Sequence, residues 1–403
     1  MKKPAIAYLF LLIATTLVCT LKPIYGVWDE VAYMSLVRQD HNAAAAYAEL
    51  QRSIPSKEYE GLIGMGSVPA SAPNDDGSVY MQDMATHPDH FMQQMPLYKV
   101  KPLFLAATWV LWKFGLPLFT ALHTVSSLSF FMTGLIVWQW LSKYIFGWAA
   151  FLVASTVILQ PFLLQTARAP LPDALGIALL VAGAYFVREQ KRDLLGAGLL
   201  LLSILARPDN LIFCVLFFIL QWMLIPLVCA VAIHFAVNHF THGWSWAKLF
   251  YHPFVHWLLT PQSTVVHVGP RLYLGILVKN TFNITMHTQL FLFVVLGIWL
   301  ILGYRTQRTF VCLCLGTIFL HQMAFPIGDN INANRFFAPE YLLILLVAAS
   351  VILGENLWSQ TERKQESSKV SKDSTQGPPP RHNNRRKLRV LKIPAMISST
   401  AIF

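Results

Sequence analysis

The sequence places two acidic positions beside long apolar runs. Asp29 and Glu30 are adjacent and follow the apolar run Pro4–Leu21, and Asp173 follows Pro172 at the beginning of another apolar run. A positioned carboxylate can act as a general base on an alcohol. An acidic residue in the first turn of a helix also stabilises the helix dipole, so simple helix capping stays open at both positions.

Cationic residues stand at similar positions beside apolar runs, namely Lys101, Arg168, Arg207 and Arg335. An arginine at membrane depth can bind two phosphate oxygens through its planar guanidinium group. A lysine at an apolar surface also reaches lipid headgroups, and an arginine can pair with a nearby carboxylate, so purely structural roles stay open. Taken together, these carboxylates and cations suit a reaction that deprotonates an alcohol and expels a phosphate carried by a lipid.

The composition sets these residues in an apolar chain. Of the 403 residues, 55% are hydrophobic and 13% are charged, whereas about a quarter of the residues in soluble proteins are charged. This excludes an ordinary soluble enzyme and a disordered scaffold. The net charge of +11 does not indicate a nucleic-acid partner, because residues 355–403 hold ten Lys/Arg against four Asp/Glu.

The apolar runs predict an all-α polytopic membrane protein with about ten transmembrane helices and external juxtamembrane helices. The run Pro102–Phe114 is shorter than the roughly 20 residues that a span needs, so we expect it to lie at the outer interface. We expect spans at Pro4–Leu21, Leu116–Leu141, Trp148–Thr166, Pro172–Val187, Leu194–Ala206, Leu211–Phe235 (two spans, broken near Pro226), Thr285–Leu302, Phe310–Phe325 and Ala338–Leu353.

The distribution of charge predicts the side of each loop. The segment from Lys22 to Lys101 is net acidic, which favours the external side, and the short loops Arg188–Arg192 and Tyr304–Arg308 are basic, which favours the cytoplasm. We therefore expect a membrane-embedded body at residues 1–354, with its first external loop at 22–101, and a basic, disordered cytoplasmic tail at 355–403. All the candidate residues then lie on the outer face.

Histidines and cysteines give weaker signals. None of the five cysteines has metal-ligand spacing, and His87 and His90 stand in a turn-like run with a proline between them, which is more typical of a loop than of a metal site. The histidines and tryptophans between His239 and Trp257 favour an interfacial belt over an acceptor groove. We expect no cofactor and no metal among the site residues, although the sequence leaves a divalent metal open.

At the candidate residues the chain resembles the integral-membrane glycosyltransferases of the GT-C fold, in the branch of the bacterial lipid A aminoarabinose transferase and the protein O-mannosyltransferases. Its members have one span, then an external loop with an Asp-Glu pair and a Tyr three residues later, and further motifs in a set order. The residues that carry the resemblance are Asp29, Glu30, Tyr33, Lys101-Pro102, Pro172-Asp173, Arg207 and Arg335 to Pro339. Several relatives have more spans and a large C-terminal external domain.

The resemblance implies a glycosyltransferase that moves a sugar from a polyprenyl-phosphate donor to an acceptor hydroxyl, with inversion at the anomeric carbon. It implies Asp29 as the base and Glu30 as its substitute, with Asp173 orienting the sugar or acceptor or holding Arg168. The donor phosphate would bind Lys101, Arg207 and Arg335, and the substrate would be oriented by Tyr33 and Arg168. The acceptor would be a glycan, a lipid or a protein.

Other functions remain open at this point. A transporter or flippase for lipid-linked saccharides would also collect cations and aromatic residues, but it would place ionisable groups at mid-membrane on broken helices. A polysaccharide polymerase or ligase has related chemistry but usually uses a diphosphate donor, and an accessory protein leaves the outward arginines unexplained. The Lys-Lys start and the short loops favour a multi-pass protein of a bacterial inner membrane with its site on the periplasmic side.

Overall fold

The computed structural model describes residues 2–22, 28–39, 80, 83–84, 87–287, 289–328 and 330–353. Within these ranges the chain is mostly helical and contains no β-strand. The proposed cytoplasmic tail and much of the first external loop lie outside the described residues. The predictions of their disorder and sidedness are therefore not tested by the structure.

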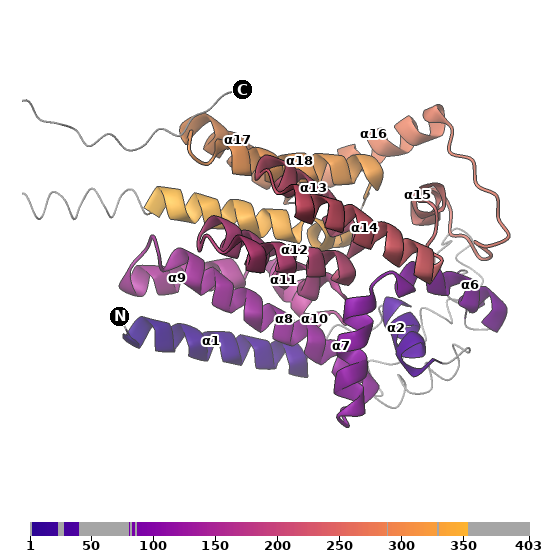
Figure 1. The fold of residues 1–403 in the computed structure, drawn as a ribbon, viewed down its shortest axis with the longest axis horizontal. Coiled ribbons are helices and arrows are strands. Elements are labelled where there is room, and N and C mark those ends of the chain that lie inside the picture. The colour runs from indigo at the N-terminus through magenta and orange to yellow at the C-terminus, as the bar shows by residue number, and fades with distance from the viewer. Residues whose placement is uncertain are drawn as a thin grey trace, which may run out of the picture. The chain divides into compact units, whose positions relative to one another are not determined.

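The chain forms a succession of helices (Figure 1). The first part of the chain contributes α1 (Lys2–Leu21), α2 (Trp28–Arg38), α6 (Pro88–Lys99), α7 (Pro102–Lys113), α8 (Leu118–Leu141), α9 (Gly147–Ile158), α10 (Pro161–Arg168), α11 (Asp173–Arg188) and α12 (Asp193–Ala206). The second part contributes the 3₁₀ turn η1 (Pro208–Asn210), α13 (Leu211–Leu220), α14 (Leu224–Thr241), α15 (Trp246–Phe254), α16 (Pro270–His287), α17 (Leu290–Gly303), α18 (Arg308–Ala324), α19 (Asn330–Phe336) and the helix Ala338–Leu353.

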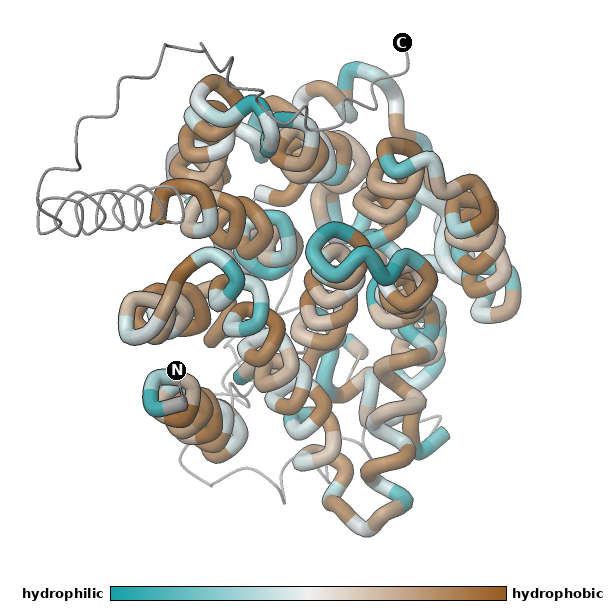
Figure 2. The backbone as a smooth tube through the Cα atoms, turned by 60° about the vertical axis from the view of Figure 1, so that its left-hand side comes forward, coloured by the Kyte–Doolittle hydropathy of each residue, from teal (hydrophilic) through white to brown (hydrophobic). Residues whose placement is uncertain are grey.

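Large apolar side chains cover the outside of several helices. On α14, for example, Ile225 is 79% exposed and Val228 is 68% exposed, and Phe10 on α1 is 70% exposed. Figure 2 shows apolar residues in brown along the length of most helices. Because water-soluble proteins rarely leave such continuous apolar surface uncovered, these helices indicate association with a membrane.

The described helices agree with an all-α membrane protein, and they include fewer clear spans than the ten expected. Among the described residues, three helices, α1, α8 and α14, are long and apolar enough to cross a membrane, and the number rises to five if the bent pairs α9–α10 and α16–α17 each form one span. Four other predicted spans correspond to apolar helices of only 10–17 residues: Asp193–Ala206, Pro208–Leu220, Arg308–Ala324 and Ala338–Leu353. A helix of 14 residues is about 21 Å long, which is less than the hydrocarbon thickness of about 30 Å.

The helix break expected near Pro226 lies earlier in the chain. Helix α13 ends at Leu220 and α14 begins at Leu224, and Trp222 between them has a positive φ of 56°. Pro226 is inside the first turn of α14, where a helix tolerates proline because the missing N–H has no partner there anyway. Apolar content alone therefore located the pair of helices but not the turn between them.

Helices α11 and α12 form a closely packed antiparallel pair. Glycines stand where the two helices meet: a Cβ atom at position 196 would lie 2.7 Å from the carbonyl oxygen of Gly183. Small residues at such a contact allow two backbones to approach each other. Because the pair is antiparallel, the first residue of α11, Asp173, and the residue that follows α12, Arg207, come to the same end.

Shorter helices pack at the end of α8 that begins with Leu118. Helix α7 runs across the direction of α1 and α8 (Figure 1), and α2 contacts α6, α7 and α8. Aromatic side chains fill the space between them, including the buried Tyr33 of α2, Phe91 and Tyr98 of α6 and Phe104 of α7. This small core fixes the beginning of α2 and the beginning of α7, which both carry candidate site residues.

Candidate active site

Asp173 joins two arginines at the centre of the site. Its Oδ1 accepts a hydrogen bond from Nη1 of Arg207 at 2.6 Å, and its Oδ2 accepts one from Nη2 of Arg335 at 3.2 Å. Asp173 and Arg207 are almost completely buried. The side chain of Arg207 lies against Gly176, where a Cβ would meet its Cδ at 2.9 Å. A glycine one turn into α11 therefore leaves room for the guanidinium group.

Arg207 has a second acidic partner two residues further along the chain. Asp209 in the turn η1 accepts hydrogen bonds from Nε and Nη2 of Arg207 at 3.1 and 2.5 Å, which is a bidentate pair. The guanidinium carbon lies 4.6 Å from the ring centre of Phe336, and Nε2 of His321 lies 3.3 Å from Oδ2 of Asp209. Arg207 is thus held on several sides at once.

Asp29 is the most exposed carboxylate in this group. Its side chain is 28% exposed, whereas those of Asp173 and Asp209 are 3% and 17% exposed. The Oδ2 atom lies 3.7 Å from Nη2 of Arg335, and Oδ1 accepts a hydrogen bond of 3.4 Å from the hydroxyl of Tyr98. Asp29 is therefore anchored by two side chains and still partly accessible to a substrate.

Lys101 stands at the N-terminus of α7 without an acidic partner among the described residues. Its Nζ donates a hydrogen bond of 2.7 Å to the hydroxyl of Tyr33 and lies 5.2 and 5.3 Å from the ring centres of Tyr33 and Tyr98. Burial lowers the pKa of Lys101, and the carboxylates of Asp29 and Asp173 oppose that shift. Burial also raises the pKa of the Tyr33 hydroxyl, and the charge of Asp29 raises this pKa further. The phenol is therefore neutral, and its oxygen accepts the hydrogen bond from the Lys101 ammonium group.

These contacts bring together most of the residues predicted from the sequence. We call the resulting group the charged cluster, and it consists of Asp29, Lys101, Asp173, Arg207, Asp209 and Arg335 with the tyrosines Tyr33 and Tyr98. It contains three carboxylates and three basic side chains. Its members come from the ends of α2, α6, α7, α11, α12 and α19 and from η1, so residues far apart in the sequence form one site.

The structure places Glu30 outside the charged cluster. Its carboxylate is completely buried, and its Oε1 lies 3.1 Å from Nε2 of the buried His123 on α8. Burial raises the pKa of Glu30, and the hydrogen bond from His123 opposes that shift. Adjacent residues of a helix point in different directions, so Asp29 and Glu30 cannot serve the same site. This geometry does not favour Glu30 as a substitute base.

Arg168 also has a different partner from the one expected. Its Nε donates a hydrogen bond of 2.7 Å to the backbone carbonyl oxygen of Lys22, at the end of α1. Asp173, which the sequence suggested as its holder, pairs with Arg207 and Arg335 instead. Arg168 therefore connects α10 to the end of α1 and has no recorded contact with the described members of the charged cluster.

Sequence reasoning missed three contributors to the site. Tyr98 had no signal of its own, because its contact with Asp29 depends on how α6 packs on α2. Asp209 was covered only by the general possibility that an arginine pairs with a nearby carboxylate. His321 could have been noticed, since an ionisable residue within an apolar helix is expensive and usually has a reason to be there.

A cavity of about 720 Å³ lies between α6 and the turn from α14 to α15. Its lining includes Asp89 and Lys99 of α6. It also includes Trp244 and Ser245, which lie between α14 and α15, and Lys248 of α15. None of its lining residues belongs to the charged cluster. The segment from His239 to Trp257 therefore lines a polar cavity as well as carrying the aromatic residues expected of an interfacial belt.

Comparison of the chain with protein-family models, with curated proteins and with solved structures finds no match.

Proposed function

We propose that this protein is a membrane glycosyltransferase that moves a sugar from a polyprenyl-phosphate donor to an acceptor hydroxyl on the outer face of a bacterial inner membrane. The observation that carries the proposal is the charged cluster. It combines a partly exposed carboxylate, Asp29, with a lysine, Lys101, that has no carboxylate partner among the described residues. Incubation with a polyprenyl-phosphate sugar labelled in the sugar, followed by detection of released polyprenyl phosphate, tests it.

The cations of the cluster would hold the donor phosphate. Arg207 already pairs with the carboxylates of Asp173 and Asp209. Arg335 pairs with Asp173 at 3.2 Å and with Asp29 at 3.7 Å. Among the described residues, Lys101 has only the Tyr33 hydroxyl as its hydrogen-bond acceptor. A phosphate would thus add the missing anion beside Lys101, and the developing negative charge on the leaving group would be stabilised by groups already in place.

Asp29 would act as the general base. The acceptor hydroxyl loses its proton to the Asp29 carboxylate while its oxygen attacks the anomeric carbon of the sugar. The bond between that carbon and the phosphate oxygen breaks, and the phosphate leaves on the lipid with both bonding electrons. Attack in line with the leaving group inverts the anomeric centre. Asp173, which is buried between two arginines, would position Arg335 rather than touch the substrate.

The placement of the charges supports an enzyme over a transporter. Asp29 and Asp173 are in the first turns of α2 and α11, Lys101 and Arg207 flank α7 and α12, and Arg335 is in the last turn of α19. A transporter is expected to hold such groups on interrupted helices at the middle of the bilayer. Charges gathered at helix ends are better placed for a reaction at headgroup level.

The proposal includes a topology with the site outside and the tail inside. Cysteines introduced at Ser71 and Ser374, both outside the described residues, should react with a membrane-impermeant thiol reagent from opposite sides of the membrane. Ser71 is expected to label in intact spheroplasts and Ser374 only after the membrane is opened. Labelling of both positions from the same side would contradict the proposed sidedness.

Lys101→Ala should weaken binding of a polyprenyl-phosphate sugar by about tenfold or more, because a hydrogen bond to a charged group contributes roughly 1.5–3 kcal/mol. The affinity is measured by titrating the purified protein with the donor lipid. Lys113→Ala is a matched control, because Lys113 ends the same helix and lies over the tryptophan ring of Trp112 at 4.2 Å. An unchanged affinity in Lys101→Ala would mean that Lys101 has only a structural role, such as contact with lipid headgroups.

The pH dependence of donor binding provides a second readout for Lys101. Its pKa is lowered by burial, so the charge that attracts phosphate is present below this lowered pKa and is lost as the pH rises through it. The affinity of the wild type should therefore fall at a pH below the usual lysine range. Lys101→Arg should keep its affinity to higher pH, because a guanidinium group stays charged. Identical pH profiles would contradict a phosphate contact by Lys101.

A further inference from the structure

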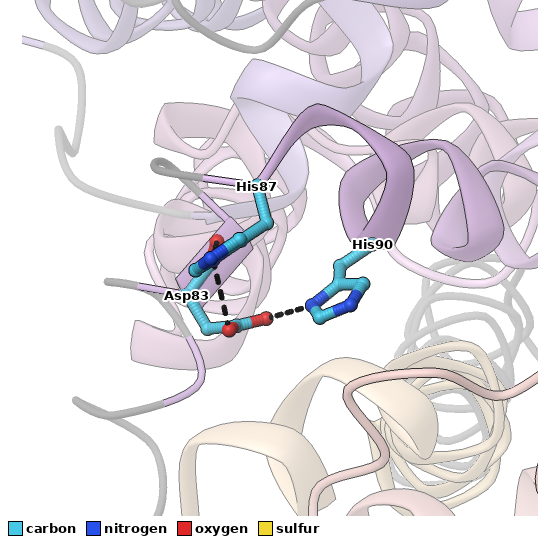
Figure 3. A group of neighbouring side chains, drawn as sticks. All are labelled: Asp83, His87 and His90. Carbon is cyan, nitrogen blue, oxygen red and sulfur yellow. Dashed lines mark hydrogen bonds and ion pairs between the residues drawn. The ribbon is translucent and has the colours of Figure 1, made fainter.

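Three side chains with metal-binding atoms meet at the N-terminus of α6, away from the charged cluster. Nδ1 of His90 lies 2.6 Å from Oδ2 of Asp83, and Nδ1 of His87 lies 3.1 Å from Oδ1 of the same carboxylate. The two imidazole rings are stacked with their centres 5.1 Å apart. Figure 3 shows both rings turned toward the carboxylate between them.

The backbone explains why the three side chains share one face. The N–H of His87 donates to the carbonyl oxygen of Asp83 at 2.8 Å, and the N–H of His90 donates to the carbonyl oxygen of His87 at 3.1 Å. The spacings of four and three residues are those at which side chains of a helical turn lie next to each other. Pro88 begins α6 between them, and proline is well accommodated at that position.

We propose that Asp83, His87 and His90 bind one Zn²⁺ ion. Two imidazoles and one carboxylate are a common ligand set for zinc, and three protein ligands leave a fourth position for water. The candidate ligand atoms all lie within 4.8 Å of one another, and two ligands of one tetrahedral zinc ion are about 3.3 Å apart at bond lengths of about 2.0–2.1 Å. Small side-chain rotations therefore bring all three onto one ion.

The position of the zinc site suits a structural role in holding α6. Asp83 precedes α6, so the ion would tie the chain before the helix to its first turn. The other end of α6 carries Tyr98, which contacts Asp29. Tyr98 is eight positions after His90, which corresponds to about 12 Å along a helix, so the ion would not touch the reacting atoms. It would instead hold the helix that positions Tyr98.

The exposure of the ligands makes the site reachable from solvent. The side chain of His87 is 59% exposed and that of His90 is 30% exposed. A simple ion pair between histidine and aspartate is the competing explanation of the same contacts. The two explanations differ in a measurable way, because only a metal site binds one Zn²⁺ per chain with an affinity that depends on all three side chains.

The test is a zinc titration of the full-length protein, purified without a polyhistidine tag and competed against a chromophoric chelator. The wild type should bind one Zn²⁺ per chain. His90→Gln and Asp83→Asn should each lower the affinity by at least about tenfold. The matched control His267→Gln removes another exposed histidine and should leave the affinity unchanged. Replacing Zn²⁺ by Co²⁺ should give the visible absorption bands of tetrahedral cobalt in the wild type and in His267→Gln, but not in His90→Gln or Asp83→Asn.

Thermal melting separates lost binding from lost folding. In the presence of a chelator, the variants should melt at the same temperature as the wild type. Added zinc should raise the melting temperature of the wild type and of His267→Gln, but not that of His90→Gln or Asp83→Asn. The proposal is overturned if the wild type binds no zinc, or if His90→Gln and Asp83→Asn bind it as tightly as the wild type. Neither readout depends on sugar transfer, so this result is independent of the proposed enzymatic function.

Discussion

Asp29→Asn should reduce the rate of sugar transfer by about a hundredfold or more, because an alcohol is a poor nucleophile at neutral pH and a positioned base supplies rate enhancement of that order. Asparagine keeps the size of the side chain and its ability to accept a hydrogen bond from Tyr98, but it cannot take up the acceptor proton. Donor binding should persist, because the phosphate contacts are assigned to Lys101 and the arginines. The measurement is transfer under saturating donor, together with a separate donor titration.

Glu30→Gln is the matched control for this prediction. Glu30 is adjacent in sequence, but its carboxylate contacts His123 in a buried position. A glutamine there keeps a hydrogen-bonding oxygen, so we expect transfer close to that of the wild type. Normal transfer by Asp29→Asn with loss in Glu30→Gln would move the base to Glu30. Normal transfer by both would contradict the proposed mechanism.

Arg207→Met should lower the free energy of unfolding by roughly 3–5 kcal/mol, because removing one partner of a buried ion pair leaves the other charge uncompensated. Here two carboxylates, Asp173 and Asp209, would lose their closest cation. Methionine keeps much of the length of the side chain but lacks the guanidinium group that lies over the ring of Phe336. The measurement is denaturant-induced unfolding of the purified protein in detergent, followed by the fluorescence of its tryptophans.

Arg168→Met is the control for that experiment. Arg168 donates one hydrogen bond to a backbone carbonyl and has no ion pair among the described residues. Its replacement should change the free energy of unfolding by about 0.5 kcal/mol or less, as is usual for surface substitutions. Equal effects of the two substitutions would mean that Arg207 is not the centre of a buried ion-pair network.

Much of the charged cluster could be predicted from the sequence because the signals were local. A charged residue at the end of an apolar run is costly, and Asp29, Lys101, Asp173, Arg207 and Arg335 each carry that signal separately. Their convergence follows from the turn between α11 and α12 and from the position of α2 and α7 at one end of α8. The helical content could also be predicted from local signals, because long apolar runs with few charges form helices.

Other features depend on tertiary contacts that no local pattern reports. The direction of Glu30 toward His123 is set by the packing of α2 on α8, and the contact of Tyr98 with Asp29 is set by the packing of α6. The predicted number of spans depends on apolar runs of 13 to 17 residues, each of which the sequence analysis counts as a crossing. In the structure several of these runs are short helices, and length decides whether a helix spans the bilayer.

The proposed function depends above all on cleavage of the bond between a sugar and a polyprenyl phosphate. The most direct measurement uses purified protein in lipid vesicles, a polyprenyl-phosphate sugar labelled in the sugar, and a bacterial membrane extract as the source of acceptors. We expect release of free polyprenyl phosphate and transfer of the label, and we expect both to be absent with Asp29→Asn. Intact donor that crosses the bilayer uncleaved, or label release that is the same with Asp29→Asn, would contradict it.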